Sequence, residues 1–150
     1  MSGEQDLVKL YSQRILALAA SIPRTERLDN PCASVKKRAP LCGSNVTVDL
    51  SIHDGVVSDF GQDVKACALG QAAASVVGAN IVGCTLAQIT TARDELRQML
   101  KENGPAPAAP FDGLEVLMAA RDYKNRHASI LLALEASVEA FQSAQKAECA

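Results

Sequence analysis

The chain has 150 residues, a formal net charge of −2 at pH 7 and a hydrophobic content of 48%, which suits one globular domain. Its 15 Lys and Arg residues are scattered and aromatic residues are scarce, so nucleic acid is not expected as a partner. No apolar run reaches the ~18 residues that a membrane-spanning helix needs. The polar start MSGEQDLVKL does not have the pattern of a signal peptide. We therefore expect one cytoplasmic domain over residues 1–150.

Five cysteines are present, at positions 32, 42, 67, 84 and 149. The cytoplasm keeps thiols reduced, so we interpret them as ligands, nucleophiles or packing residues rather than as a disulfide framework. Cys149 lies in a segment, about 146–150, that we expect to be disordered. Cys32 has no role that the sequence assigns.

The first predicted element is an amphipathic helix whose apolar residues recur at steps of three or four. These residues are Leu7, Tyr11, Ile15, Leu18 and Ile22. Pro23 is expected to end the helix. The turn-rich segment RTERLDNP follows, and then a short strand is predicted over about 33–38.

A hairpin is the clearest local prediction. The segment VTVDLSI (46–52) alternates apolar and polar residues, which is typical of a strand with one buried face. Asp54-Gly55 favours a type I′ turn, and VVSDF (56–60) is predicted to be the returning strand. With 33–38, these strands predict a three-stranded antiparallel sheet.

Helical patterns follow the hairpin. The small-residue segment ACALGQAAASVV predicts a helix that begins at Cys67 and ends at Gly78. Thr85 and Gln88 form a capping box for the next helix, and the loop GPAPAAP (104–110) separates it from the last one. The last helix carries one stripe of residues: His127, Ile130, Leu134, Val138 and Phe141. This order predicts an α+β fold with helices packed on one face of the sheet.

Three residues at the ends of predicted elements are candidates for chemistry. Cys42 precedes the central strand, and Cys67 opens a helix whose free N–H groups and dipole favour a thiolate. His127 lies at the start of the last helix. Cys67 also fits as a small packing residue, and His127 as a hydrogen-bonded boundary residue. If the three converge, they supply three ligands with a fourth position open, whereas Cys84 is expected about 18 Å away, at the far end of its helix.

Three segments, LCGSNVTVDLSIHDG, DFGQDVKACALGQAAAS and DYKNRHASILLALEA, resemble in order and spacing the motifs of IscU/NifU-type iron–sulfur cluster assembly scaffolds. The resemblance implies that Cys42, Cys67 and His127 bind iron, a [2Fe–2S] cluster or zinc. It also implies a cysteine desulfurase as sulfur source, recipient apoproteins as partners, and a binding protein rather than an enzyme. Whether the chain forms a homo-oligomer is left open by the sequence.

The chain departs from the family pattern at two positions. Ser44 stands where the family has an acidic residue after Cys-Gly, and Ala128 stands where it has its last motif cysteine. His127 then either matches the family's histidine or, with an offset of one residue, replaces that cysteine. An all-cysteine site, which [2Fe–2S] clusters usually have, is excluded.

Four functions therefore remain open from the sequence. The first is a cluster scaffold or carrier. The second is a zinc-binding sulfur relay in which a thiolate accepts persulfide sulfur. The third is an enzyme with Cys67 as nucleophile and His127 as base, and the fourth is a family member that binds only protein partners.

Overall fold

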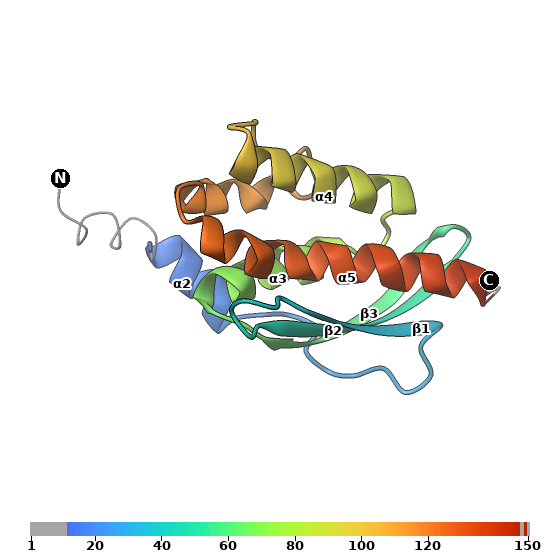
Figure 1. The fold of residues 1–150 in the computed structure, drawn as a ribbon. Helices are drawn as coiled ribbons and strands as arrows, with labels where there is room; N and C mark the ends of the chain where they lie inside the picture. The colour runs from blue at the N-terminus through green and yellow to red at the C-terminus, as the bar shows by residue number, and fades with distance from the viewer. Residues whose placement is uncertain (1–11, 148, 150) are drawn as a thin grey trace, which may run out of the picture.

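A three-stranded antiparallel sheet forms the base of the computed structural model, which describes residues 12–147 and 149. The strands β1 (Ala33–Arg38), β2 (Asn45–His53) and β3 (Val56–Lys65) lie in the order β1-β2-β3 (Figure 1). The predicted sheet is thus confirmed, and β1 matches the predicted strand. β3 extends beyond the predicted 56–60 because it pairs with β2 as far as Lys65.

The hairpin between β2 and β3 has the predicted turn. Asp54 and Gly55 have φ angles of 52° and 79°, the positive values that a type I′ turn requires at both central positions. A register shift between Ser51 and Ile52 accommodates the twist of the long strands.

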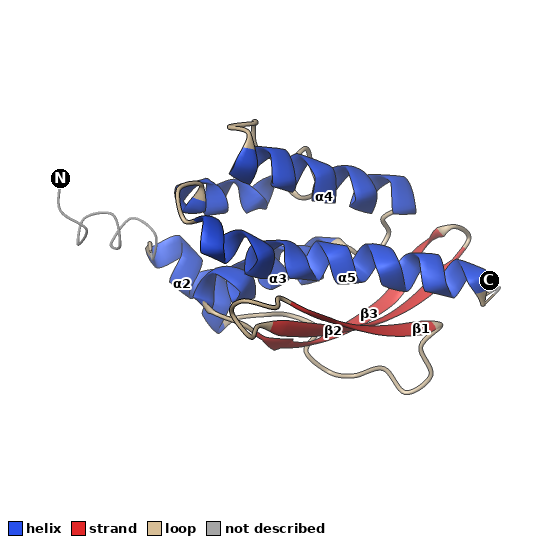
Figure 2. Ribbon diagram, in the orientation of Figure 1, coloured by secondary structure: helices blue, strands red, loops and turns tan. Residues whose placement is uncertain are grey.

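The helices lie on one side of the sheet, as predicted (Figure 2). They are α2 (Gln13–Ala20), α3 (Ala68–Asn80), α4 (Leu86–Lys101) and α5 (His127–Lys146), with 3₁₀ segments η1 (Asp112–Ala120) and η2 (Lys124–Arg126) before α5. α5 packs against β1, β2 and α3, and α4 packs on its outer side. The predicted capping box of Thr85 and Gln88 at the start of α4 is confirmed.

Three helix boundaries differ from the sequence predictions. α2 ends at Ala20 rather than at Pro23. α2 begins after Ser12, whose hydroxyl accepts from the Ile15 N–H at 3.3 Å; Leu7 and Tyr11 lie outside the described residues. α3 does not end at Gly78 but continues to Asn80. Gly78 is needed for packing, because a Cβ there would lie 2.6 Å from Nε2 of Gln62.

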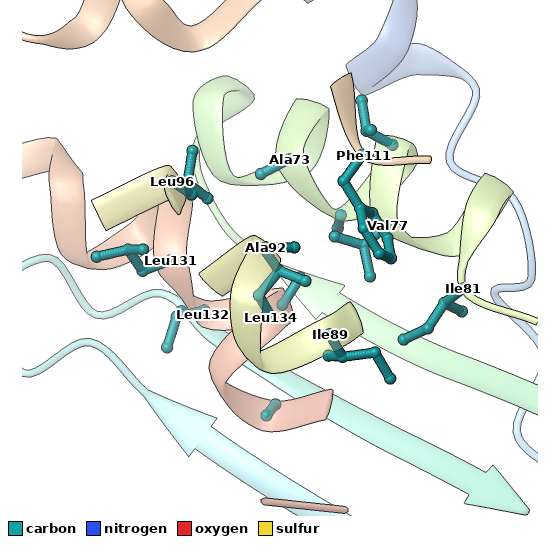
Figure 3. Packing of buried hydrophobic residues seen from close by; sticks show 14 of the residues in the cluster. Ala73, Val77, Ile81, Ile89, Ala92, Leu96, Phe111, Leu131, Leu132 and Leu134 are labelled. Carbon is teal, nitrogen blue, oxygen red and sulfur yellow. The ribbon is translucent and has the colours of Figure 1, made fainter. Parts of the chain in front are cut away.

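Side chains of α3, α4 and α5 meet in the core shown in Figure 3. Alanines such as Ala73 and Ala92 are buried at the contacts and let the helix backbones approach closely. Leucines such as Leu96 and Leu134 fill the remaining volume, each burial contributing roughly 1.5–3 kcal/mol. The core is therefore built mainly from small and aliphatic side chains, with three buried phenylalanines, Phe60, Phe111 and Phe141, as its largest members.

The other face of the sheet is covered by the loop between α2 and β1, which runs beneath the strands in Figure 1. Asp49 on β2 is fully buried there and pairs with Arg27, with a 2.6 Å distance from Nε to Oδ2. The Leu28 N–H and the Ser34 hydroxyl also donate to this carboxylate, at 3.0 and 2.7 Å. Gly61 lies directly over the Glu26 carbonyl, where a Cβ would overlap it.

Two of the five cysteines are not free thiols, as the sequence interpretation expected, but are bonded to each other. Cys32 and Cys149 form a disulfide that joins the start of β1 to the chain beyond α5, across a sequence separation of 117. The prediction that all five cysteines are free is therefore wrong for these two, because the α5–sheet packing brings them together. Glu148 and Ala150 lie outside the described residues. No helix in the described part of the chain is long and apolar enough to cross a bilayer.

Candidate functional site

Cys42 and Cys67 line one surface hollow of about 260 Å³. Its walls come from the β1–β2 loop, the end of β3, the start of α3 and the turn before α5. The lining residues are Cys42, Gly43, Ser44, Lys65, Ala66, Cys67 and Arg126. We call this region the two-cysteine hollow.

A tight turn presents Cys42 at the rim of the hollow. The Ala39 N–H donates to the Ser44 carbonyl at 2.8 Å, and the Gly43 N–H donates to the Ala39 carbonyl at 3.1 Å. Gly43 has a φ of 74°, a conformation that glycine adopts without strain. The turn leaves Cys42 exposed and the neighbouring Leu41 94% exposed.

Cys67 is the residue that caps the start of α3, and its side chain is half-buried. Burial alone raises the pKa of its thiol. The Gly70 N–H, the Ser129 hydroxyl, the Leu69 N–H and the charge of Arg126 outweigh burial, so the net pKa is lowered. The helix start thus favours a thiolate at Cys67, as the sequence position predicts.

Two serine hydroxyls connect the two cysteines. The Cys42 thiol donates to the Ser44 hydroxyl at 3.3 Å, and the Ser129 hydroxyl donates to Ser44 at 3.1 Å. Ser129 lies 3.5 Å from the Cys67 sulfur. Gly70 makes room for this contact, because a Cβ at that position would lie 2.5 Å from the Ser129 oxygen.

The sequence interpretation missed Ser129. A glycine inside the alanine-rich segment of α3 was the available signal, because it marks a close approach of another element. Nothing local indicated that this element was the first turn of α5. Ala128, the position of the missing motif cysteine in the resemblance, is exposed.

His127 does not reach the two-cysteine hollow. Its imidazole is 1% exposed, and its Nε2 lies 3.1 and 3.0 Å from the carbonyl oxygens of Ala120 and Arg121. The ring lines a different hollow, together with residues such as Lys101 and Arg121. The expected convergence of three residues is therefore observed for Cys42 and Cys67 only.

Helix geometry explains this separation. Positions two apart on an α-helix lie on nearly opposite sides of it, since each residue turns by about 100°. Ser129 faces Cys67, so His127 faces away. Cys67 and His127 therefore do not form the nucleophile–base pair considered from the sequence.

The hollow presents two thiols, the Ser44 hydroxyl and two cations. Lys65 and Arg126 line it, and none of the described lining residues is acidic. Throughout residues 12–147 and 149, no three His, Cys, Asp or Glu side chains are grouped so as to hold a metal ion. Cys84 lies beyond the other end of α3, as expected; it is buried, donates to the Asn80 carbonyl at 3.3 Å, and has a pKa that burial raises.

Known proteins share this arrangement of elements. The chain is 43% identical to a NifU-like protein (N-terminal) from Brucella abortus of known crystal structure, with a TM-score of 0.91 over 94% of this chain and 98% of that chain. It is 30% identical over 90 residues to the iron–sulfur cluster assembly scaffold protein IscU of Thermotoga maritima. That match covers 60% of this chain and 63% of the length of IscU.

A further structure shows the fold alone. The putative SUF-system scaffold protein SufU of Fervidobacterium islandicum AW-1 has a TM-score of 0.76 at 19% identity, over 89% of this chain and 98% of that one. No family model matches the chain. The fold and the sequence similarity define a protein of the scaffold class. The chain belongs to the IscU/NifU-like iron–sulfur cluster assembly scaffold family.

Proposed function

We propose that this protein is an iron–sulfur cluster scaffold or carrier that binds iron or a nascent cluster and delivers it to recipient apoproteins. One observation carries the proposal: Cys42 and Cys67, which come from different elements of the fold, line the same hollow with Lys65 and Arg126. Thiolates are the usual ligands of iron–sulfur clusters, and the cations offset their negative charge.

The two cysteines have different parts in this proposal. Cys67 is held in place by the start of α3 and provides a thiolate. Cys42 lies on an exposed turn, so it can bind cargo and release it without disturbing the core. A cysteine desulfurase is the sulfur donor in this proposal, and the cytoplasm is where it acts.

His127 remains the third candidate ligand from the sequence, but its participation needs a conformational change. The imidazole would have to leave the carbonyl oxygens of Ala120 and Arg121 and cross to the other side of α5. We therefore base the proposed site on Cys42 and Cys67.

Anaerobic reconstitution with ferrous iron and sulfide tests this function. We expect the chain to retain iron and acid-labile sulfide and to develop visible absorption, and Cys67→Ser to lose both. Cys84→Ser is the matched control, because Cys84 is buried outside the hollow, and it should load normally. Equal losses in the two variants, or no retention by the unmodified chain, would contradict the proposal.

A sulfur relay is a second candidate, favoured by the lowered pKa and partial exposure of Cys67. Its thiolate would attack the terminal sulfur of a donor persulfide, forming a new sulfur–sulfur bond on Cys67 while the donor leaves as a thiolate. Incubation with a cysteine desulfurase and cysteine would then add the mass of one sulfur atom to the peptide containing Cys67. A colourless protein that holds zinc and acquires this sulfur would favour the relay over the scaffold.

A further inference from the structure

The imidazole of His127 has one nitrogen that the fold does not use. Its Nε2 lies 3.1 and 3.0 Å from the carbonyl oxygens of Ala120 and Arg121. A carbonyl oxygen only accepts hydrogen bonds, so Nε2 carries a proton and donates to them. Nδ1 is buried and has no hydrogen-bond partner among the described residues. In the neutral ring, Nδ1 therefore holds a lone pair that can accept a bond from an O–H or N–H group.

This ring lines a hollow of about 420 Å³ at the surface. The walls of the hollow come from the end of α4, the turn after η1 and the start of α5. The lining residues include Lys101, Asn103, Arg121, Asp122, Lys124 and His127, and none of the lining residues belongs to the two-cysteine hollow. We call this region the His127 hollow. Its volume lies in the range of small-molecule sites, roughly 300–1,000 Å³.

The His127 hollow carries an excess of positive charge. Lys101, Arg121 and Lys124 line it, and Asp122 is the one acidic residue among the described lining residues. Neither lysine forms an ion pair with another residue in the described part of the chain. Asp122 offsets one of the three positive charges, and the others have no counter-charge in the hollow. A concave surface with this balance attracts anions.

Arg121 gives the hollow a donor that is fixed in place. Its Nε donates to the Met99 carbonyl at 2.7 Å, and its Nη2 donates to the Gly104 carbonyl at 2.6 Å. These two bonds orient the guanidinium plane. Nη1 takes part in neither of them and is the donor left for a ligand. A planar guanidinium held in this way suits an oxyanion such as phosphate.

The cations and the unpartnered nitrogen together define one ligand chemistry. We propose that the His127 hollow binds a small phosphate-bearing ligand that also has an O–H donor, either inorganic phosphate or a phosphate ester of a hydroxylated molecule. The phosphate oxygens accept from Arg121 and the two lysines, and the O–H donates to Nδ1 of His127. Near neutral pH, inorganic phosphate is largely a dianion that keeps one O–H, so it meets both requirements. The proposal does not depend on the cargo function proposed above.

Sulfate distinguishes this chemistry from attraction between charges alone. Near neutral pH, sulfate resembles hydrogen phosphate in size and charge but has no O–H, so Nδ1 stays without a partner. A site that hydrogen-bonds the O–H of its ligand rejects an analogue that lacks it. We expect the chain to bind inorganic phosphate roughly tenfold or more tightly than sulfate.

Isothermal titration calorimetry of the metal-free chain with inorganic phosphate, sulfate and glycerol 3-phosphate measures these affinities. Lys124→Gln should weaken phosphate binding roughly threefold to tenfold, because it removes an exposed cation from the hollow. Lys146→Gln is the matched control, because Lys146 is an exposed lysine in the last turn of α5, and it should bind as the unmodified chain does. Tighter binding of glycerol 3-phosphate than of phosphate would support the ester as the occupant, and weaker binding would support free phosphate.

His127→Gln separates the part of Nδ1 from the part that the ring plays in the fold. The glutamine amide reaches the position of Nε2 and can donate to the same two carbonyl oxygens, but it has no acceptor at the position of Nδ1. We expect this variant to retain cooperative unfolding in urea and to bind phosphate and sulfate with equal affinity.

Three outcomes would overturn the proposal. The first is equal affinity of the unmodified chain for phosphate and sulfate, or no phosphate binding at millimolar concentration. The second is an equal loss of phosphate binding in Lys124→Gln and Lys146→Gln, which would place the anion outside the hollow. The third is a preference for phosphate over sulfate that persists in His127→Gln.

Discussion

The Ser129 hydroxyl donates a 3.1 Å hydrogen bond to the Ser44 hydroxyl, between residues 85 positions apart. This bond links the first turn of α5 to the turn that carries Cys42, and Ser129 also contacts Cys67. The two sulfurs are thus held in one hollow by groups that are not ligands themselves. The Ser44 and Ser129 hydroxyls are hydrogen-bonded to each other. Neither brings a charge to the two thiols, whereas a carboxylate at either position would.

Ser129→Ala should raise the pKa of the Cys67 thiol. Ser129 is one of the groups that lower this pKa. Its single O–H proton is donated to Ser44 while Cys67 is a thiol, and to the sulfur when Cys67 is a thiolate. Its removal therefore shifts the pH dependence of Cys67 alkylation to higher pH. The measurement is iodoacetamide labelling of the metal-free chain followed by peptide mass spectrometry. Ser137→Ala is the control, because Ser137 is also buried on α5 but bonds to the Ala133 carbonyl. Coincident pH profiles of the two variants would contradict the role of Ser129.

Ser44→Asp should tighten the retention of iron or zinc. Its side chain would replace a hydroxyl that lies 3.3 Å from the Cys42 sulfur, adding an oxygen ligand and a negative charge beside two cations. Competition with a chromophoric chelator measures the affinity. An unchanged affinity would show that the carboxylate turns away from the cargo.

His127→Ala should destabilise the fold more than it weakens cargo binding. Loss of the imidazole leaves the Ala120 and Arg121 carbonyls without this partner, at a cost of about 1–3 kcal/mol in the free energy of unfolding. Urea denaturation of the metal-free chain checks this cost. Cys67→Ser is the comparison, because it should abolish loading with little change in stability. Loss of loading in His127→Ala with unchanged stability would instead support a ligand role.

The buried Asp49 should make stability depend on pH in the acid range. Burial acts to raise its pKa, but the bonds from Arg27, Ser34 and the Leu28 N–H outweigh it, so the folded-state pKa is lowered. The contribution of Asp49 to the free energy of unfolding is then complete above its unfolded-state pKa of about 4. It is lost as the pH falls through the folded-state pKa.

Asp49→Asn should therefore lower the free energy of unfolding at neutral pH by about 2–3 kcal/mol and flatten its decline below pH ~4. Urea denaturation at several pH values tests this. Glu139→Gln is the control, because its pair with Lys37 is exposed and should contribute less than about 1 kcal/mol. If the free energy of unfolding of Asp49→Asn still fell in the acid range, groups other than Asp49 would be responsible for the fall.

Removal of the disulfide should lower stability by about 3–5 kcal/mol, because it closes a long loop in the unfolded chain. Cys149→Ser removes it without touching the hollow. A reductant should shift the urea midpoint of the unmodified chain towards that of the variant, and leave the variant unchanged. A reductant that shifts neither midpoint would show that the pair contributes nothing.

Much of the fold could be predicted from local patterns. Alternation in residues 46–52, positive φ at Asp54-Gly55 and the capping box at Thr85 each depend on neighbouring residues only, and the structure confirms them. Gly78 was misjudged because its role depends on Gln62, a residue of another element. A glycine that ends a helix and one that admits a neighbour look the same in a sequence.

The candidate site likewise combines features that local sequence predicts with features that depend on tertiary contacts. The sequence by itself determined the sheet, the helices and the position of Cys67 at a helix start, since hydrophobic periodicity and the signals that begin a helix are local properties. Only the tertiary structure decided that Ser129 rather than His127 faces Cys67, that Cys32 pairs with Cys149, and that Arg27 covers Asp49. The physical reason is that the rotation of α5 about its axis is set by the sum of its contacts with the sheet, α3 and α4, and a turn of about 100° per residue exchanges one side chain for another.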